Sequence, residues 1–190
     1  MSRYTLYLCR GYRNGQTIPL LLQCAEDFLN IERGSLDASC ILRTGYGKPF
    51  FSGLPVEVSV SHTGSLFAVL ITGRENGPVG LDVQAVRDAD YRRLAGRFFT
   101  LQEQQYVEEN GEDGFFCIWT RKEALTKYLG LPLAKTLRRH SVVSDGRPAE
   151  QVEDAQLFHI DLGSGICASA AVQASNKVNL CRKEMNEKQS

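Results

Sequence analysis

The sequence predicts an α+β fold with two pseudo-symmetric halves, each a three-stranded antiparallel meander with a packed helix. Apolar and polar residues alternate over residues 56–61, which is typical of a half-buried strand. Residues 115–129 have the apolar spacing of a helix. The pattern at residues 58–68 recurs roughly 100 residues later, at 158–168, and a helical stretch precedes it each time. The alternative is coincidence, because any two meanders share such alternation.

The first half is expected to contain one helix and the first meander. Residues 18–30 mix apolar and polar positions at helical spacing, and residues 41–51 form a loop that glycine and proline interrupt. An Asn-Gly hairpin signal at 76–77 separates the last two strands. The three expected strands are residues 56–61, 66–72 and 78–84.

The second half is expected to be rich in helix before its strands begin. Residues 89–99 and 101–110 are expected helices, and Asn110-Gly111 ends the second of them. The helix over residues 115–129 ends at Gly130. Four strands follow, at residues 141–143, 157–162, 166–172 and 178–181. We therefore divide the chain into an N-terminal half (1–85), a C-terminal half (86–182) and a polar tail (183–190).

Composition excludes several classes of protein. The 190 residues include 22 basic and 22 acidic side chains, so the net charge is zero, which argues against wholesale binding of nucleic acid. The longest apolar run, residues 66–71, is far shorter than the roughly 20 residues of a membrane span, and the first ten residues lack a sustained apolar stretch, so we do not expect a secretory signal. The six cysteines are scattered without a Cys-x-x-Cys pair, which indicates reduced cysteines of a cytoplasmic protein.

Several common catalytic motifs are absent from the sequence. Gly47-Lys48-Pro49 lacks the upstream glycine and the following hydroxyl residue of a phosphate-binding P-loop. Gly163-x-Gly165 precedes a strand pattern, whereas a dinucleotide site requires a helix there. Neither a His-Glu-x-x-His metal motif nor a serine nucleophile elbow occurs. Three short polar motifs are left as candidates.

Two of these motifs contain a carboxylate. Asp82 and Gln84 lie two residues apart near the end of an expected strand, so their side chains point to the same side. Glu123 and Lys127 lie four residues apart in the expected helix over 115–129, so they share one face. Each motif taken singly has an ordinary alternative, which is a solvated acidic side chain or a surface ion pair.

The third motif, Ser61-His62, lies where a strand runs into a turn, and a histidine in such a place is most often structural. Taken together, the motifs contain the parts of a phosphoryl-transfer site. Asp82 and Glu123 could clamp a hard cation such as Mg²⁺. Positive charge for a polyphosphate would come from Lys48, His62 and Lys127.

These motifs resemble, in order, those of the 4′-phosphopantetheinyl transferases of the surfactin-synthetase-activating type, whose single chain contains two pseudo-symmetric halves. The resemblance spans residues 47–127. Any one motif alone would be weak, and their order makes the signal specific. The matching segments are Gly47-Lys48-Pro49, Val-Ser-Val-Ser61-His62-Thr-Gly, Gly80-Leu-Asp82-Val-Gln84, Phe98-Phe-Thr-Leu-Gln-Glu103 and Trp119-Thr-Arg-Lys122-Glu123-Ala-Leu-Thr-Lys127.

The resemblance implies a reaction and a set of roles. Coenzyme A binds with Mg²⁺, or with Mn²⁺ in its place, the 4′-phosphopantetheine arm moves to a serine of an acyl or peptidyl carrier protein, and adenosine 3′,5′-bisphosphate leaves. Asp82, Glu123 and Gln84 would hold the metal, and Lys127 would neutralise phosphate charge. Glu123 or Glu103 would accept the serine proton. The coenzyme A phosphates would be gripped by Lys48, Ser61, His62, Lys127 and Arg43.

One departure from the family pattern lies at Gln84, where the family has a glutamate. A neutral amide coordinates a metal more weakly, and water could replace it, so we expect weak metal binding without substrate. The departure keeps open a non-catalytic coenzyme A- or carrier-binding module. A Mg²⁺-dependent phosphohydrolase that uses the same cluster is a further alternative.

The resemblance also bears on partners and setting. We expect a cytoplasmic monomer without nucleic-acid or membrane partners, serving fatty acid, polyketide or nonribosomal peptide synthesis. Carrier proteins are typically acidic, and basic side chains cluster after the strand that carries Asp82. They could steer such a partner, or they could form an ordinary solvated helix face. These side chains are Arg87, Arg92, Arg93 and Arg97.

Overall fold

Two four-stranded sheets form the centre of the computed structural model, which describes residues 2–185. The first sheet has the order β12-β1-β5-β4, with β1 (Ser2–Arg10), β4 (Val56–Thr63), β5 (Leu66–Gly73) and β12 (Val178–Met185). The second has the order β6-β11-β10-β9, with β6 (Val79–Ala85), β9 (Gln151–Val152), β10 (Ala155–His159) and β11 (Ile166–Gln173). Two short hairpins lie outside them, β2 (Ile41–Arg43) with β3 (Pro49–Phe51) and β7 (Val143–Ser144) with β8 (Arg147–Pro148).

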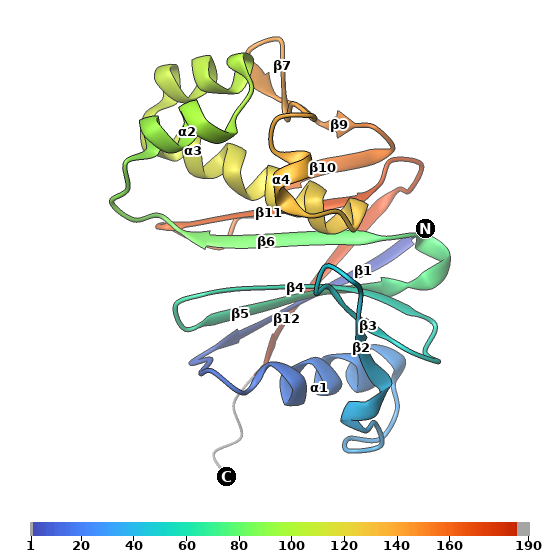
Figure 1. Cartoon of the computed structure of the whole chain (residues 1–190). Coiled ribbons are helices and arrows are strands. Elements are labelled where there is room, and N and C mark those ends of the chain that lie inside the picture. Colours follow the sequence, from blue (N-terminus) through green and yellow to red (C-terminus); the bar gives the residue numbers. More distant parts are fainter. Residues whose placement is uncertain (1, 186–190) are drawn as a thin grey trace.

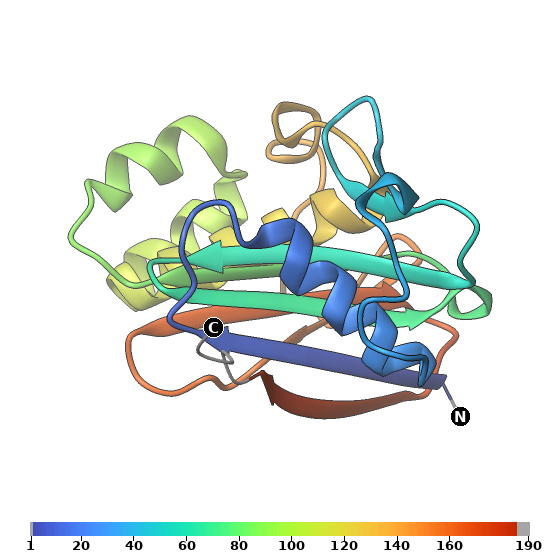
Figure 2. The same ribbon diagram turned by 90° about the horizontal axis from the view of Figure 1, so that it is seen from below.

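The helices cover the outer faces of the two sheets, so the molecule has four layers (Figure 1). Figure 2 shows α1 lying across the first sheet, and α2 and α3 cover the second sheet in Figure 1. One apolar cluster lies between the sheets and one lies under the helices on each side. The helices are α1 (Thr17–Leu29), α2 (Tyr91–Phe98), α3 (Leu101–Leu129) and α4 (Leu133–Thr136), with 3₁₀ turns η1 (Ala38–Cys40) and η2 (Arg74–Asn76).

The expected internal repeat is visible in the strand pairing. In the first sheet β1 pairs antiparallel with β5, and β5 pairs antiparallel with β4. In the second sheet β6 pairs antiparallel with β11, and β11 pairs antiparallel with β10. Apart from the short strands, the first half (β1, α1, β4, β5) and the second half (β6, α3, β10, β11) therefore have the same sequence of strand, helix, strand and strand. In each sheet the first strand pairs with the last of the three. The α+β class is confirmed, with antiparallel pairing in both repeats, and the similar stretches 58–68 and 158–168 fall in the β4–β5 and β10–β11 hairpins. The expected strand 178–181 belongs to β12, which pairs with β1 in the first sheet and does not extend the second meander.

The expected pairing of the third strand in the first meander, residues 78–84, is wrong. Residues 79–85 form β6, which pairs with β11 in the other sheet and not with β5. Both faces of β6 are buried, with Leu81 and Val83 between the sheets and Gly80 against α3. Its apolar pattern therefore suits either sheet and does not specify the partner strand. The division of the chain after residue 85 stays a prediction.

The ends of the described chain meet in the first sheet. β12 pairs in parallel with β1, in register from Ser2 opposite Val178 to Cys9 opposite Met185. The sequence pattern predicts no strand at β1, and it predicts a loop where the β2–β3 hairpin lies. The expected polar tail is a strand as far as Met185, and its remainder, 186–190, lies outside the described residues.

Helix α3 carries most of the motif residues, and its ends are well specified. Thr100 and Glu103 form a capping box at its start, and Gly130 ends it with φ 63°. Gly111, with φ 64° and ψ −145°, breaks it into two segments, as the expected helix end at Asn110-Gly111 required. Among the described residues, no helix is both long and apolar enough to cross a membrane.

Candidate active site

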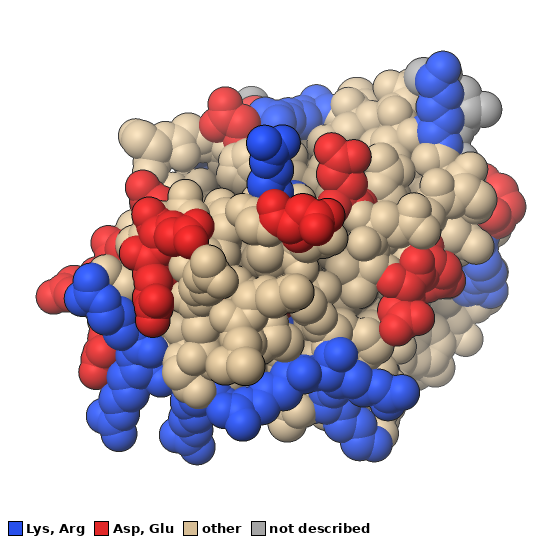
Figure 3. All heavy atoms as spheres, turned by 90° about the horizontal axis from the view of Figure 1, so that it is seen from above, with Lys and Arg blue, Asp and Glu red and all other residues tan. Residues whose placement is uncertain are grey.

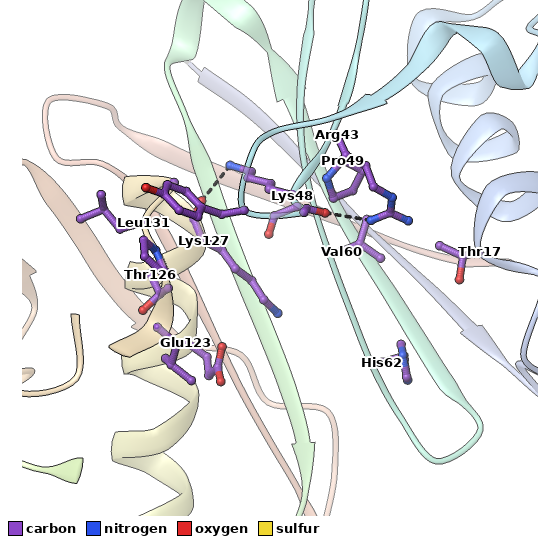
Figure 4. A pocket seen from close by; sticks show the side chains of 16 residues that line it. Thr17, Arg43, Lys48, Pro49, Val60, His62, Glu123, Thr126, Lys127 and Leu131 are labelled. Atoms are coloured by element: carbon purple, nitrogen blue, oxygen red, sulfur yellow. Dashed lines mark hydrogen bonds between the residues drawn. The ribbon is translucent and has the colours of Figure 1, made fainter. Parts of the chain in front are cut away.

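A cavity of about 420 Å³ lies where the two halves meet. The first half contributes the β2–β3 hairpin, the start of α1 and the exposed edge of β4, and the second contributes the end of α3 and the segment before α4. Figure 4 shows the side chains of Glu123 and Lys127 on α3 facing those of the hairpin and of β4. The polar side chains that line the cavity include Thr17, Arg43, Lys48, His62, Glu123 and Lys127.

Close packing of α3 on β6 depends on a glycine. A Cβ on Gly80 would lie 1.9 Å from the carbonyl oxygen of Ala124 and 2.7 Å from the backbone nitrogen of Tyr128. Only a residue without a side chain allows this approach. Because side chains alternate along a strand, Asp82 lies on the same face of β6 as Gly80, towards α3. The glycine thus brings Glu123 and Lys127 to Asp82.

Asp82 is buried, and its carboxylate is held on one side by two donors. Its Oδ1 accepts a hydrogen bond of 2.8 Å from Ser61 Oγ and pairs with Lys127 Nζ at 2.8 Å. Lys127 Nζ also donates to the carbonyl of Leu81 at 2.8 Å. Within residues 2–185 no hydrogen bond uses the second oxygen, Oδ2. One oxygen of Asp82 is therefore fixed by the protein, and the other makes no hydrogen bond within the described residues.

Glu123 is half-buried beside this pair. Burial, followed by the negative charge of Asp82, raises the pKa of Glu123 to about 6, and the Lys127 ammonium opposes this shift. Two neighbouring carboxylates in a partly enclosed site are the oxygen donors that Mg²⁺ prefers. No group of three His, Cys, Asp or Glu residues gathers among the described residues, so further ligands would come from an amide, substrate or water. Gln84, two residues beyond Asp82 on β6 and half-buried, could supply that amide.

Lys48 has a different position from the expected one. Its Nζ donates to the carbonyls of Val79 at 2.8 Å and of Lys127 at 2.9 Å, so it joins the hairpin loop to β6 and to the last turn of α3. Burial lowers the pKa of Lys48 to about 8; Glu57 raises this pKa and Lys127 lowers it further. Both bonds are made to backbone carbonyls, so the expected grip of this amine on a phosphate is replaced by a contact between the halves.

The remaining expected coenzyme ligands divide into engaged and accessible groups. The Ser61 hydroxyl is buried and its single hydrogen is used, since it donates to Asp82 and also accepts from the backbone N–H of Val83. His62 is exposed at the cavity, with its ring centroid 5.1 Å from that of Tyr12. Arg43 is also exposed, and one of its nitrogens donates to the Gly47 carbonyl at 2.8 Å. The accessible basic side chains among these are therefore His62 and Arg43, together with Lys127.

Glu103 is not brought to the cavity, which corrects its expected role as a proton acceptor. The side chain is completely buried, and it accepts hydrogen bonds from the backbone nitrogens of Thr100 and Val142. It also pairs with Lys122 Nζ at 2.8 Å. The Thr100-x-x-Glu103 spacing is that of a capping box, so the sequence did contain a signal for this structural role.

Sequence reasoning missed two residues on which the geometry depends. Gly80 was read only as part of a motif, although a glycine inside a strand often marks a close approach of backbone. Ser59 was read as the polar face of a half-buried strand, whereas it is buried and accepts a hydrogen bond from Leu81 N–H at 2.9 Å. The sequence signal for Ser59 was its repetition, because hydroxyl residues occupy positions 59, 61 and 63.

Comparisons with known proteins found relatives of this chain. A family model described as the 4′-phosphopantetheinyl transferase superfamily matches residues 78–175, which include Asp82, Glu123 and Lys127. The 4′-phosphopantetheinyl transferase AcpT of Salmonella typhi is 39% identical over 90 residues, covering 44% of this chain and 46% of that protein. The 4′-phosphopantetheinyl transferase Sfp of Bacillus subtilis strain 168 is 26% identical over 139 residues, covering 66% and 60% respectively. The chain spans about half the length of the curated relatives that it matches.

Proposed function

The chain belongs to the 4′-phosphopantetheinyl transferase superfamily, and from this premise we propose that it transfers the 4′-phosphopantetheine arm of coenzyme A to a serine of a carrier protein. The observation that carries the proposal is that Glu123 and Lys127 line the cavity between the halves, and that the buried Asp82 pairs with Lys127 just behind them. The relatives named above are themselves called 4′-phosphopantetheinyl transferases. We include Mg²⁺ as the metal and adenosine 3′,5′-bisphosphate as the leaving product.

The proposed chemistry is a displacement at phosphorus. The carrier serine oxygen forms a bond to the phosphorus that bears the pantetheine, and the bond from that phosphorus to the bridging oxygen breaks. Adenosine 3′,5′-bisphosphate leaves with the electron pair, and the serine proton goes to the Glu123 carboxylate, directly or through one water. Lys127 lies where it can neutralise charge on the pyrophosphate. Positioning and charge neutralisation supply most of the rate in such reactions.

The metal would be held by Asp82 and Glu123, with the Gln84 amide as a weaker third ligand. The donor set fits a hard cation, because both carboxylates are close enough for the charge of Asp82 to raise the pKa of Glu123. When bound, Mg²⁺ would supply charge neutralisation at the pyrophosphate. We assign coenzyme A phosphate contacts to His62, Arg43 and Lys127, since the polar atoms of Lys48 and Ser61 are engaged within the protein.

The carrier protein is expected to approach a basic surface. Arg92, Arg93 and Arg97 of α2 are exposed, and Arg138 donates to the carbonyls of Gly96 and Arg97 on the same helix. Figure 3 shows basic side chains gathered along one edge of this face of the molecule. Such a surface steers an acidic partner. Reversing the charges of Arg92 and Arg93 should flatten the salt dependence of carrier modification, and an unchanged salt dependence would leave only a solvated helix face.

We also propose a monomeric, cytoplasmic enzyme. No disulfide bond joins its six cysteines in the described part of the chain, as expected for a reducing compartment. The two sheets and the cavity where the halves meet are completed within one chain, so the proposed site needs no second copy.

One experiment tests the transferase. The protein is incubated with coenzyme A, Mg²⁺ and an apo carrier protein, and the carrier is weighed by mass spectrometry. We expect a gain of one phosphopantetheine, lost in Asp82→Ala and Glu123→Ala and retained in the exposed control Glu108→Ala. No gain on several carriers, with coenzyme A still bound, would indicate a non-catalytic binding module. Cleavage of coenzyme A without a carrier would indicate a phosphohydrolase.

A further inference from the structure

Three hydroxyl side chains of β4 close the free edge of β6. The backbone N–H groups of Leu81, Val83 and Ala85 donate to them at 2.9, 3.1 and 2.9 Å respectively. The accepting oxygens belong to Ser59, Ser61 and Thr63, which we call the hydroxyl seam. The seam joins the two sheets without a backbone ladder between them.

The hydroxyl seam supplies hydrogen-bond acceptors for backbone N–H groups of β6 that β11 does not pair. This strand is hydrogen-bonded to β11 on one edge, and its other edge would leave alternate backbone N–H groups unpaired inside the protein. Hydroxyls at every second residue of β4 match every second N–H of β6, because both strands repeat with a period of two. Ser59 and Ser61 are both buried, so water is not the ordinary partner of either N–H group.

Ser61 differs from Ser59 in one contact. A serine hydroxyl has one hydrogen to donate and lone pairs that accept. Both hydroxyls accept an N–H of β6, but only Ser61 also donates to a carboxylate, Asp82 Oδ1, at 2.8 Å. The N–H of Val83 fixes the position of Ser61 Oγ, and Ser61 Oγ in turn fixes the rotation of the Asp82 carboxylate. Together with Lys127 it occupies Oδ1 and leaves Oδ2 to a ligand.

We propose that Ser61 is a positioning residue for Asp82, which sets the affinity of the cation site, and that it is not a coenzyme A ligand. The inference rests on the proposed function, in which Asp82 holds the metal. A hydrogen-bonded partner that orients a metal ligand typically contributes 10- to 100-fold to metal affinity. The neighbouring residues Ser59 and Thr63 share the structural role of Ser61 without its contact to Asp82, so the chain contains its own control.

The test measures Mn²⁺ binding to the full chain by electron paramagnetic resonance. No carrier protein is present, and the titration is made once with coenzyme A and once without it. We expect Ser61→Ala to weaken Mn²⁺ binding about tenfold. Ser59→Ala should leave the Mn²⁺ affinity within about twofold of the wild type. Both variants should shift the urea unfolding midpoint by similar amounts, since each variant loses one acceptor for a buried N–H. Ser61→Thr should retain most of the Mn²⁺ affinity, because a threonine hydroxyl can accept the Val83 N–H and donate to Asp82 as the serine hydroxyl does.

The outcomes separate this inference from the proposed function. Equal Mn²⁺ affinity in Ser61→Ala and Ser59→Ala overturns the positioning role, even if phosphopantetheine transfer is observed. Weaker binding of coenzyme A without metal in Ser61→Ala, with Mn²⁺ affinity intact, makes Ser61 a coenzyme ligand and also overturns it. A Ser61-dependent Mn²⁺ site in a protein that transfers nothing supports the inference and removes the transferase. Absence of Mn²⁺ binding in the wild-type protein under both conditions rejects the cation site and the inference together.

Discussion

Two lysines of helix α3 form ion pairs of the same chemistry in opposite surroundings. Lys122 pairs with Glu103 and Lys127 pairs with Asp82, and both Nζ–O distances are 2.8 Å. The side chains of the first pair are 1% and 0% exposed, whereas those of the second are 25% and 9% exposed. Five residues along one helix thus separate a pair enclosed by protein from a pair that borders the cavity.

The partners of each lysine show what the enclosure means. Lys122 Nζ also donates to the backbone carbonyls of Leu137 and His140 and lies 5.8 Å from the Phe99 ring centroid, so protein atoms satisfy it completely. Burial lowers the pKa of Lys122, and Glu103 opposes that shift. Lys127 shares its carboxylate with Ser61 and has one side towards the cavity. The enclosed pair is suited to holding the fold, and the open pair is suited to binding a ligand.

The largest expected effect comes from breaking the enclosed pair. Lys122→Met should lower the free energy of unfolding by about 3–5 kcal/mol, because it leaves the Glu103 carboxylate buried without a counter-charge. Urea unfolding followed by circular dichroism measures the loss. The double variant Lys122→Met/Glu103→Gln should recover part of it, since the amide needs no cation.

A different result would reverse the two assignments. If Lys122→Met unfolds within about 1 kcal/mol of the wild type and yet loses transfer, the enclosed pair serves the reaction. Glu103 would then regain the proton-acceptor role that the sequence suggested for it.

Breaking the open pair should affect the reaction more than the fold. Lys127→Met should lower kcat about 10²–10³-fold, the usual cost of removing one charge-stabilising group. The partly exposed pair should contribute at most about 1 kcal/mol to stability. Carrier modification rates and urea unfolding, measured on one preparation, test both parts. A loss of stability as large as that of Lys122→Met, with kcat unchanged, would contradict the distinction.

The contact between α3 and β6 can be changed at one glycine. Gly80→Ala should destabilise the protein by about 1–3 kcal/mol, because its Cβ would lie 1.9 Å from the Ala124 carbonyl oxygen. It should also raise the Mn²⁺ dissociation constant, since moving α3 separates Glu123 from Asp82. Gly96→Ala in α2 is the matched control: nothing lies within 4 Å of its Cβ, and a helical alanine is more stable than a glycine. Equal effects at both glycines would rule out the close contact as their cause.

Local sequence features predicted the parts of the structure that depend on local chemistry. Asn110-Gly111 and Gly130 end helical segments where glycine is needed, because both glycines have positive φ. Strand and helix periods placed Asp82 on one face of a strand and Glu123 with Lys127 on one face of a helix, and the structure brings the three together. The order of the motifs carried the family resemblance, which the family match over residues 78–175 confirms.

Other features depended on contacts that alternation cannot encode. A strand with two buried faces such as β6 suits either sheet, so its pairing with β11 could not be derived from the pattern. The polar atoms of Lys48 and Ser61 were expected to bind phosphates, because a sequence does not show whether a donor already has a protein partner. Glu103 was placed in the reaction by its motif, although its spacing from Thr100 also indicated a cap.

Metal binding beside the open pair, Lys127 with Asp82, can be tested at Gln84, where the family pattern has a glutamate. Gln84→Glu should tighten Mg²⁺ binding without coenzyme A about tenfold, or about 1.4 kcal/mol, because it adds a third anionic ligand. With coenzyme A present the gain should shrink, since the pyrophosphate supplies oxygen ligands. Mg²⁺ titration by calorimetry of wild type and variant, with and without coenzyme A, measures both. An unchanged affinity without coenzyme A would exclude position 84 as a metal ligand.

Lys48 is the third lysine beside α3, and its Nζ bonds only carbonyls, without a salt bridge to a carboxylate among the described residues. Burial lowers its pKa to about 8 in the folded protein, below the ordinary 10.5, so the unfolded chain binds more protons between these values. Stability should therefore rise with pH in this window, and from pH 7.5 to 9.0 the wild type should gain about 1 kcal/mol relative to Lys48→Met.

Urea unfolding without ligands at both pH values, at equal ionic strength, measures the difference in unfolding free energy between the wild type and Lys48→Met. Exposed Lys135→Met is the control, and its difference from the wild type should not change with pH. A gap that does not change with pH would mean that the Lys48 amine is solvated, and its bonds between the halves would then contribute little to the closure of the cavity.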